Sequence, residues 1–181
     1  MRRVRTFRAI TLISAALLVC LPPVSSAASS HPRGVDCTIT GTAGPDTLAG
    51  TTGDDVICGL GGRDVIRARS GADVVFGGPE NDTIFGGGGD DVLHGGADRD
   101  LVRGLGGDDL VFGDAASDFP LTGDFGSDIV NGGTGNEVCI SGFDEVEGND
   151  TVIGGPGIDH YEIDAGDTSN SAEILGFCIN E

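Results

Sequence analysis

The sequence predicts an all-β fold built from many short turns and short strands. Glycine supplies 33 of the 181 residues, well above the roughly 7% of an average chain, and glycine accepts the backbone angles of tight turns. From Gly41 onward the chain repeats every nine residues. Each repeat ends in a triplet such as Val65-Ile66-Arg67, which is rich in residues that favour strands. A fixed short period of this kind is typical of solenoid proteins.

Residues 1–28 predict a secretory signal peptide. Four arginines precede the uncharged run Ala9 to Leu21, and small residues follow as far as Ala28. The uncharged run is shorter than the roughly 20 apolar residues of a membrane span. A lipoprotein anchor at Cys20 is the alternative, but Val19 stands where a small residue is expected. We therefore expect a secreted, extracellular protein without a transmembrane segment.

The cysteines that remain after this signal are expected to form two disulfides. Cys37, Cys58, Cys139 and Cys178 can pair in three ways, and four cysteines in a small exported chain favour disulfides. Their positions near the two ends favour Cys37 with Cys58 and Cys139 with Cys178. Free thiols or a metal site are the alternatives, although no CxxC spacing supports metal.

The charge balance excludes several classes of function. The net charge is −19, and all 10 basic residues are Arg. Removal of the signal leaves six Arg against 29 acids, a net charge of −23. A nucleic-acid binder needs a basic face, while a Walker phosphate loop and a Schiff-base enzyme both need Lys. Disorder is the main alternative for so acidic a chain, but 38% of the residues are apolar.

The repeat divides the chain. Eight units, such as GLGGRDVIR and GGGGDDVLH, run from Gly41 to Phe112 without insertion. The ninth, Gly113 to Thr122, is one residue too long; units 123–131 and 132–140 return to register, and four extra residues, 141–144, precede units 145–153 and 154–162. We expect an N-terminal cap with a worn repeat at 29–40, the repeats at 41–162 and a C-terminal cap at 163–181.

Two places of the repeat are nearly constant. Place one is Gly in eleven of thirteen units, and place six is acidic in every unit. Place eight is Leu, Ile or Val in ten units, with Pro120, Cys139 and Tyr161 as exceptions. Since strand side chains alternate between faces, place eight should point to one side and places seven and nine to the other.

This pattern, G-G-x-G-x-D-x-U-x, resembles the RTX (repeats-in-toxin, hemolysin-type) calcium-binding nonapeptide, over about 120 residues. The resemblance implies a right-handed parallel β-roll, or β-solenoid, in which two nonapeptides complete one coil. Turns eighteen residues apart would then stack about 4.8 Å from one another. Place eight would fill the interior.

Such stacking places the acidic residues in two columns that predict calcium sites. One edge receives Asp46, Asp64, Asp82, Asp100 and Asp118; the other receives Asp55, Asp73, Asp91, Asp109 and Asp128; Asp150 and Asp159 occupy place six in later units. Calcium mixes carboxylate and carbonyl oxygens in flexible geometry, whereas magnesium prefers a tight octahedron. The uninterrupted units offer about six gaps for Ca²⁺, and the later units could add more. We expect metal-free protein to be largely unfolded, with binding and folding as one transition.

Other positions are open to two interpretations. Cys58, Phe76, His94 and Phe112 would align on one outer face, which predicts either an interface or packing and β propensity alone. The acids Glu80 and Asp98 replace Gly at place four, either as tolerated drift, which we favour, or as extra ligands. The first Asp of each Asp-Asp pair, at positions 54, 90 and 108, is expected to be solvated charge.

The sequence therefore predicts a secreted calcium-binding β-roll protein with a structural or interaction role and no catalytic domain. A protein or a cell-surface glycan could be a further partner. One alternative is a polysaccharide-acting β-solenoid enzyme, whose basic residue could come only from Arg63, Arg67, Arg69, Arg99 and Arg103. Another is an adhesin or ice-binding surface, for which only Thr38-Ile39-Thr40 shows paired threonines. Neither HExxH nor G-x-S-x-G occurs in the chain.

Overall fold

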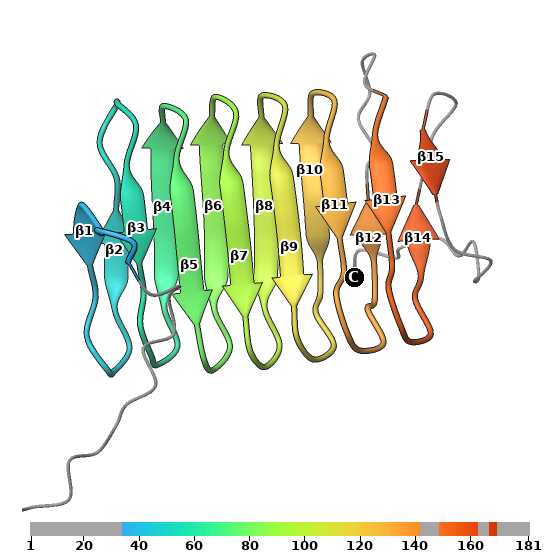
Figure 1. Cartoon of the computed structure of the whole chain (residues 1–181), viewed down its shortest axis with the longest axis horizontal. Coiled ribbons are helices and arrows are strands. Elements are labelled where there is room, and N and C mark those ends of the chain that lie inside the picture. Colours follow the sequence, from blue (N-terminus) through green and yellow to red (C-terminus); the bar gives the residue numbers. More distant parts are fainter. Residues whose placement is uncertain (1–33, 142–148, 163–166, 170–181) are drawn as a thin grey trace, which may run out of the picture.

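The computed structural model describes residues 34–141, 149–162 and 167–169, which form a parallel β-solenoid of two sheets (Figure 1). One sheet contains, in spatial order, β1 (Ile39–Thr40), β3 (Val56–Cys58), β5 (Val74–Gly78), β7 (Val92–Gly96), β9 (Leu110–Asp114), β11 (Ile129–Asn131), β13 (Thr151–Ile153) and β15 (Thr168–Ser169). The other contains β2 (Thr47–Ala49), β4 (Val65–Ser70), β6 (Thr83–Gly88), β8 (Leu101–Gly106), β10 (Leu121–Phe125), β12 (Ile140–Ser141) and β14 (Tyr161–Glu162). The predicted all-β roll is confirmed.

Each coil of the roll contains two repeats. Strands that pair in parallel are eighteen residues apart in the regular part of the chain, as in the pairs Ile66↔Ile84 and Val75↔Leu93. Successive strands of the chain alternate between the two sheets, both of which run along the long axis, and Figure 1 shows the turns stacked along the two long edges. The register therefore holds equivalent turn residues of successive coils next to one another.

The interior is filled mainly by place eight, as the alternation of strand side chains requires. Fully buried side chains form one core cluster: Ile57, Ile66, Ala68, Val75, Ile84, Leu93, Val102, Val111, Leu121, Val130, Ile140, Val152 and Tyr161. Ala68 is the one place-one residue among them.

The assignment of Pro120 and Cys139 to the inward place is wrong. Leu121 pairs with Val102 and with Ile140, so each of these two repeats places an extra residue between its acid and its inward side chain. The main chain adapts locally, because Cys139 has a positive φ of 71°. The pattern of nine was right, but its last three places slip by one.

The four extra residues of the later repeats do not begin at Ser141. Ser141 is buried in β12, where it pairs with Thr122 and with Glu162. The acid columns step by 22 residues from Asp128 to Asp150, four more than in the regular coils. One of these four is the extra residue before Ile140, and the other three follow Ser141. Residues 142–144 lie outside the described residues.

The N-terminal disulfide prediction is confirmed. Cys37 and Cys58 are bonded, with Cα atoms 6.0 Å apart, which ties the segment before β1 to β3. Cys139 is also disulfide-bonded, but its expected partner Cys178 lies outside the described residues. The predicted signal peptide, 1–28, and most of the predicted C-terminal cap lie outside them too. Within the described part of the chain, no helix is long and apolar enough to cross a membrane.

The two outer faces differ in chemistry. On the eight-stranded sheet, the register aligns Cys58, Phe76, His94 and Phe112 as predicted. The rings of Phe76 and His94 stack with centroids 5.2 Å apart, and those of His94 and Phe112 with centroids 4.7 Å apart. On the seven-stranded sheet the corresponding row alternates Arg67, Phe85 and Arg103.

Candidate metal centre

The place-six carboxylates lie inside the turns and form the two predicted columns. In each column, the backbone N–H of one acid donates to Oδ1 of the aligned acid in the next coil, at distances of 2.7–2.8 Å for the regular coils. The first column joins Asp46, Asp64, Asp82, Asp100 and Asp118, and the second joins Asp55, Asp73, Asp91, Asp109 and Asp128, and continues to Asp150. The extra residues are therefore absorbed without breaking the columns.

The second carboxylate oxygen of these acids is the unusual feature. The Oδ2 atoms of Asp64, Asp73, Asp82, Asp91, Asp100, Asp109 and Asp118 are buried and have no hydrogen-bond partner, and both carboxylate oxygens of Glu137 are in the same state. Buried polar atoms in native proteins almost always have a partner. The arrangement therefore leaves oxygen ligands aimed into protein interior with no donor in reach.

Place one is glycine in most coils because these oxygens crowd it, and Ala68 is the described exception. A Cβ added to Gly77 would lie 2.6 Å from Oδ2 of Asp82 and would also overlap the carbonyl oxygen of Gly95 in the next coil. The same two neighbours, a carboxylate oxygen and a carbonyl oxygen of the following coil, meet Gly59, Gly86, Gly95, Gly104 and Gly113. Each place-one glycine therefore opens room where a carboxylate and a main-chain carbonyl converge.

Burial strongly disfavours negative charge at these positions. Desolvation, with neighbouring carboxylates adding to it, raises the pKa of Asp100 and Asp109 to about 8 and that of Asp82 to about 7. It raises the pKa of Asp91 and Asp118 to about 6 and about 7. A divalent cation between stacked carboxylates would reverse this effect, because it replaces repulsion by attraction.

The acids at the ends of the columns have side-chain hydrogen-bond partners that the acids of the regular coils in the middle lack. Oδ2 of Asp46 accepts from the backbone N–H of Thr42 at 2.6 Å and from its hydroxyl at 2.9 Å, and Asp55 is bonded to Thr51 in the same way. The hydrogen bonds from Thr51 lower the pKa of Asp55. At the other end, the Tyr161 hydroxyl donates to Oδ2 of Asp159 at 3.5 Å. These three predicted ligands thus have protein partners of their own.

The predicted ligand set omitted two residues that the columns include. Glu137 stands at place six; its backbone N–H donates to Oδ1 of Asp159 at 3.2 Å, and burial raises its pKa to about 8. Asp167 accepts from the backbone N–H of Asp150 at 3.0 Å and precedes β15. Glu137 was detectable from its place in the repeat. Asp167 lies in the segment 163–181, which was expected to be a cap because the nonapeptide pattern is largely lost there.

The acids at places four and five lie outside the columns. Glu80 and Asp98 are exposed and have positive φ of 70° and 73°, so they tolerate the backbone that glycine has at this place. The place-five acids are also exposed. Their carboxylates accept main-chain N–H groups of the next coil, as Asp54 does from Ala72 at 2.9 Å. Both kinds of acid therefore lie on the outer surface of the turns and accept hydrogen bonds from the main chain of a neighbouring coil.

The columns fit a hard cation with oxygen ligands. The described residues contain no group of three or more His, Cys, Asp or Glu side chains placed to hold a metal ion. Calcium does not need such a group, because it accepts about six to eight oxygens from carboxylates, main-chain carbonyls and water. Each gap between coils offers carboxylates from two coils and nearby carbonyl oxygens, which suits calcium better than zinc.

Comparison with known proteins identifies the repeat. Neither the curated proteins nor the solved structures with which the chain was compared gave a match. A family profile for the RTX calcium-binding nonapeptide repeat matches residues 38–66, 67–102, 85–120, 121–144 and 147–161. These matches cover more than half of the chain and coincide with the coils that carry the acid columns. The chain therefore belongs to the RTX calcium-binding nonapeptide repeat family.

Proposed function

We propose that the protein is a secreted calcium-binding β-roll whose folding is driven by Ca²⁺ held between stacked turns. Its role would be structural or in binding a partner, without catalysis. The observation that carries this proposal is the set of buried Oδ2 atoms that have no hydrogen-bond partner. A carboxylate that is desolvated and unpartnered either binds a proton or needs a cation.

The ligands follow from the columns. Asp64, Asp82, Asp100, Asp118 and Glu137 would serve one edge, and Asp73, Asp91 and Asp109 the other. Gaps between neighbouring members of this set number four on the first edge and two on the second, hence about six ions. Asp128 and Asp150 continue the second column and could extend it. Asp46, Asp55 and Asp159 would terminate the columns, since Thr42, Thr51 and Tyr161 already bond them.

Secretion would supply what this fold needs. Extracellular calcium is abundant, and an oxidising compartment permits the Cys37–Cys58 bond. Residues 1–28 have the features of an export signal. The chain would therefore remain unfolded in the calcium-poor cytoplasm and fold after export.

Circular dichroism and isothermal titration test the proposal. We expect strand content to appear on calcium addition to EGTA-treated mature protein, with a stoichiometry near six, and magnesium at equal concentration to be much less effective. Equal strand content in EGTA and in calcium would contradict it. A screen for polysaccharide cleavage by the calcium-loaded protein separates the enzyme alternative, because the proposed roll cleaves nothing.

A further inference from the structure

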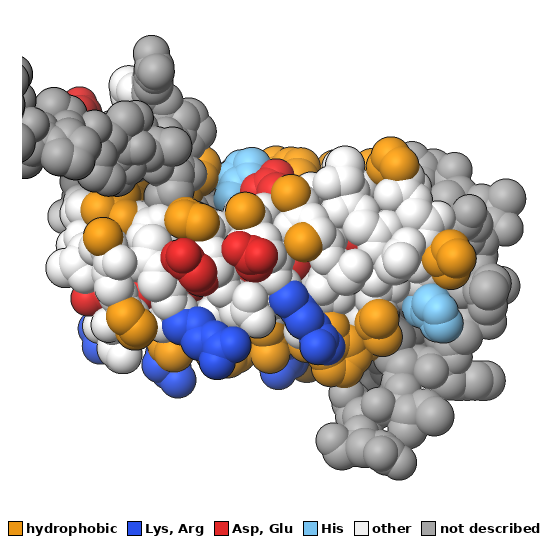
Figure 2. All heavy atoms as spheres, turned by 90° about the horizontal axis from the view of Figure 1, so that it is seen from below, with side chains coloured by type: hydrophobic (Ala, Val, Ile, Leu, Met, Phe, Trp, Pro, Cys, Tyr) orange, Lys and Arg blue, Asp and Glu red, His pale blue; other side chains and the backbone are white. Residues whose placement is uncertain are grey.

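The arginines are confined to one side of the roll. The described residues contain five, all in or directly before β4 and β8 of the seven-stranded sheet: Arg63 and Arg99 precede the strands, Arg67 and Arg103 lie within them, and Arg69 lies near the far end of β4. Arg67 and Arg103 occupy the same row, with Phe85 between them. Figure 2 looks at the turns end-on and shows basic side chains along the lower border of the view and none along the upper border. A chain with a charge of −19 thus presents one cationic face.

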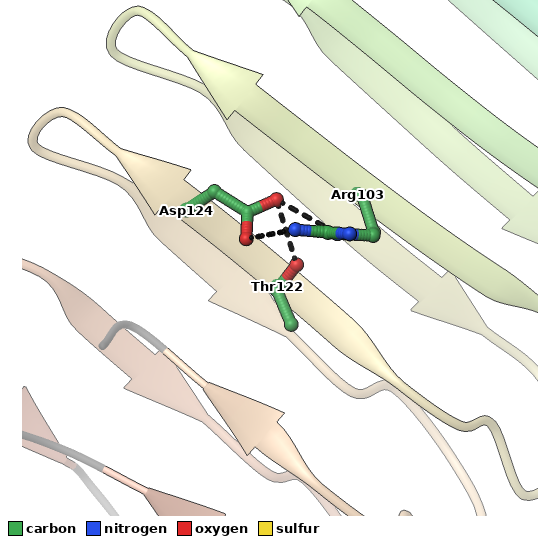
Figure 3. Close-up of polar contacts among 3 residues, drawn as sticks. All are labelled: Arg103, Thr122 and Asp124. Atoms are coloured by element: carbon green, nitrogen blue, oxygen red, sulfur yellow. Dashed lines mark hydrogen bonds and ion pairs between the residues drawn. The ribbon is translucent and has the colours of Figure 1, made fainter. Parts of the chain in front are cut away.

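Most of these arginines lack an acidic partner. Arg103 forms a two-pronged ion pair with Asp124, with Nε to Oδ2 at 3.0 Å and a terminal nitrogen to Oδ1 at 2.7 Å, and Thr122 donates to the same carboxylate (Figure 3). Among the described residues, the other four arginines form no ion pair. All four are exposed.

The exposed place-four acids of this edge accept hydrogen bonds from the main chain. Glu80 accepts from the backbone N–H of Gly62 at 2.7 Å, and Asp98 accepts from that of Glu80 at 3.3 Å. A chain with so many acidic residues could place a carboxylate beside every arginine, yet these four have none within ion-pair distance among the described residues. The charge of Arg99 counteracts the rise in the pKa of the buried Asp118 carboxyl, but none of the four guanidinium groups is in an ion pair among the described residues. Their N–H groups are therefore available to an anion from outside.

Aromatic rings hold two of the four in place. The guanidinium of Arg67 lies over Phe85, and that of Arg99 lies over Phe119, each 5.4 Å from the ring centroid. Such stacking leaves the N–H edges and the outer face of the planar group open. The surface is thus ordered before any ligand arrives, which lowers the entropy cost of binding.

We propose that this arginine face, Arg63, Arg67 and Arg99 with Phe85 and Phe119, binds a linear acidic polysaccharide that bears one carboxylate on every second sugar. Equivalent positions of the β4 and β8 coils are two coils apart, about 10 Å, so Arg63 and Arg99 repeat at that interval along the roll. A polysaccharide of this kind places its carboxylates at a comparable interval. It would lie across the strands, parallel to the long axis.

The charge of the whole protein selects this ligand over denser polyanions. Nucleic acid carries a phosphate about every 3.4 Å per strand, so most of its charges would face an acidic protein and be repelled. A second copy of the chain would bring its own large negative charge. A polymer with widely spaced carboxylates meets the arginines while adding little repulsion.

Binding should depend on folded coils, because residues 59–67 and 95–103 form one surface only when β4, β6 and β8 pair. In this respect alone the inference rests on the proposed calcium-driven folding. Circular dichroism on the same samples keeps the two apart: a protein that folds without calcium and binds the sugar would overturn only the folding proposal.

The test uses full mature protein in calcium and size-defined hyaluronan oligosaccharides, measured by isothermal titration. The variant Arg63→Gln/Arg67→Gln/Arg99→Gln removes three charges from the face. A control, Thr52→Asp/Ala72→Asp/Ser127→Asp, makes the same change in net charge at exposed places of the opposite edge. Three exposed ion pairs at up to about 1 kcal/mol each predict a loss of about tenfold or more in affinity for the first variant. The control should bind within about twofold of wild type.

Several results would overturn the proposal. One is the absence of hyaluronan binding by the folded wild type; another is equal loss in both variants. Neutral dextran binding as tightly as hyaluronan would show that the carboxylates are not recognised. Tighter binding of single-stranded DNA, or arginine-dependent self-association in sedimentation, would assign the face to another kind of partner.

Discussion

Acidification of metal-free protein should fold it. In the metal-free roll, burial raises the pKa of Asp82, Asp100 and Asp118 from an ordinary 3.8 to about 7–8. The folded state therefore binds protons that the unfolded chain has released. Since the folded pKa values are the higher ones, this stability is fully present below the unfolded pKa of 3.8 and is lost as the pH rises from there to the folded pKa of about 7–8.

The size of the effect follows from the same shifts. One pKa unit corresponds to about 1.4 kcal/mol, so lowering the pH by two units, from near 7 to near 5, recovers about 3 kcal/mol for each carboxyl whose folded pKa is near 7 or above. Asp82, Asp100, Asp109, Asp118 and Glu137 meet that condition. If coupling halves their joint effect, the gain is still on the order of 7 kcal/mol, comparable to the whole stability of many domains.

The assay is far-UV circular dichroism with dynamic light scattering on calcium-stripped mature protein between about pH 8 and pH 5. We expect a disordered, expanded chain at the alkaline end and a compact β signal at the acidic end, reversibly. Calcium affinity should fall over the same range, because each ion must displace protons. Metal-free protein that stays unfolded at pH 5, or is already folded at pH 8, would refute the reasoning.

Three further predictions concern single features of the roll. Asp100→Asn should weaken calcium binding about tenfold or more by titration, because two neighbouring gaps share this carboxylate, whereas Asp90→Asn, an exposed place-five control, should leave it unchanged. Gly77→Ala should cost more than about 2 kcal/mol in calcium-loaded urea unfolding, because its Cβ would overlap main chain, while Gly88→Ala enters open space and should cost under about 1 kcal/mol. Reduction of the Cys37–Cys58 bond should cost about 3 kcal/mol and increase hydrogen exchange in β1 and β3 first; uniform exchange along the roll would contradict that assignment.

The fold was predictable because a repeat reports its own geometry. A period of nine with acid at place six and an aliphatic residue at place eight fixes which side chains are buried, and the register of Ile66 with Ile84 agrees. The slips at Leu121 and Ile140 were signalled in the sequence, because Pro120 and Cys139 break the aliphatic pattern of place eight and an aliphatic residue follows each. The pattern does not show how the chain accommodates the extra residue, and the pairing of Leu121 with Val102 and with Ile140 does.

The sequence predicts which acids form the candidate site, but not how their carboxylate oxygens are buried and hydrogen-bonded. The sequence places Asp82 in a column, yet it does not show that one oxygen is bonded along the column while the other has no partner. That division depends on the coil spacing, which brings a main-chain N–H of Asp64 to Oδ1 and leaves Oδ2 against Gly77. Side-chain identity alone carries no information on either contact.

The ends of the columns show why equal repeats do not make equal sites. An interior acid has a coil on each side, whereas the acids of the first coil, Asp46 and Asp55, have a complete acid-bearing turn on one side only. In the structure Thr42 and Thr51 donate to the oxygens that remain without partners elsewhere. Threonine occurs at place two in these first two units and in no later one, so the departure from the consensus is itself informative. A solenoid that holds cations between coils needs another partner for the first carboxylate of each column, because no earlier coil supplies further ligands there. At each edge a threonine hydroxyl and its backbone N–H donate to that carboxylate, so it is satisfied without a metal.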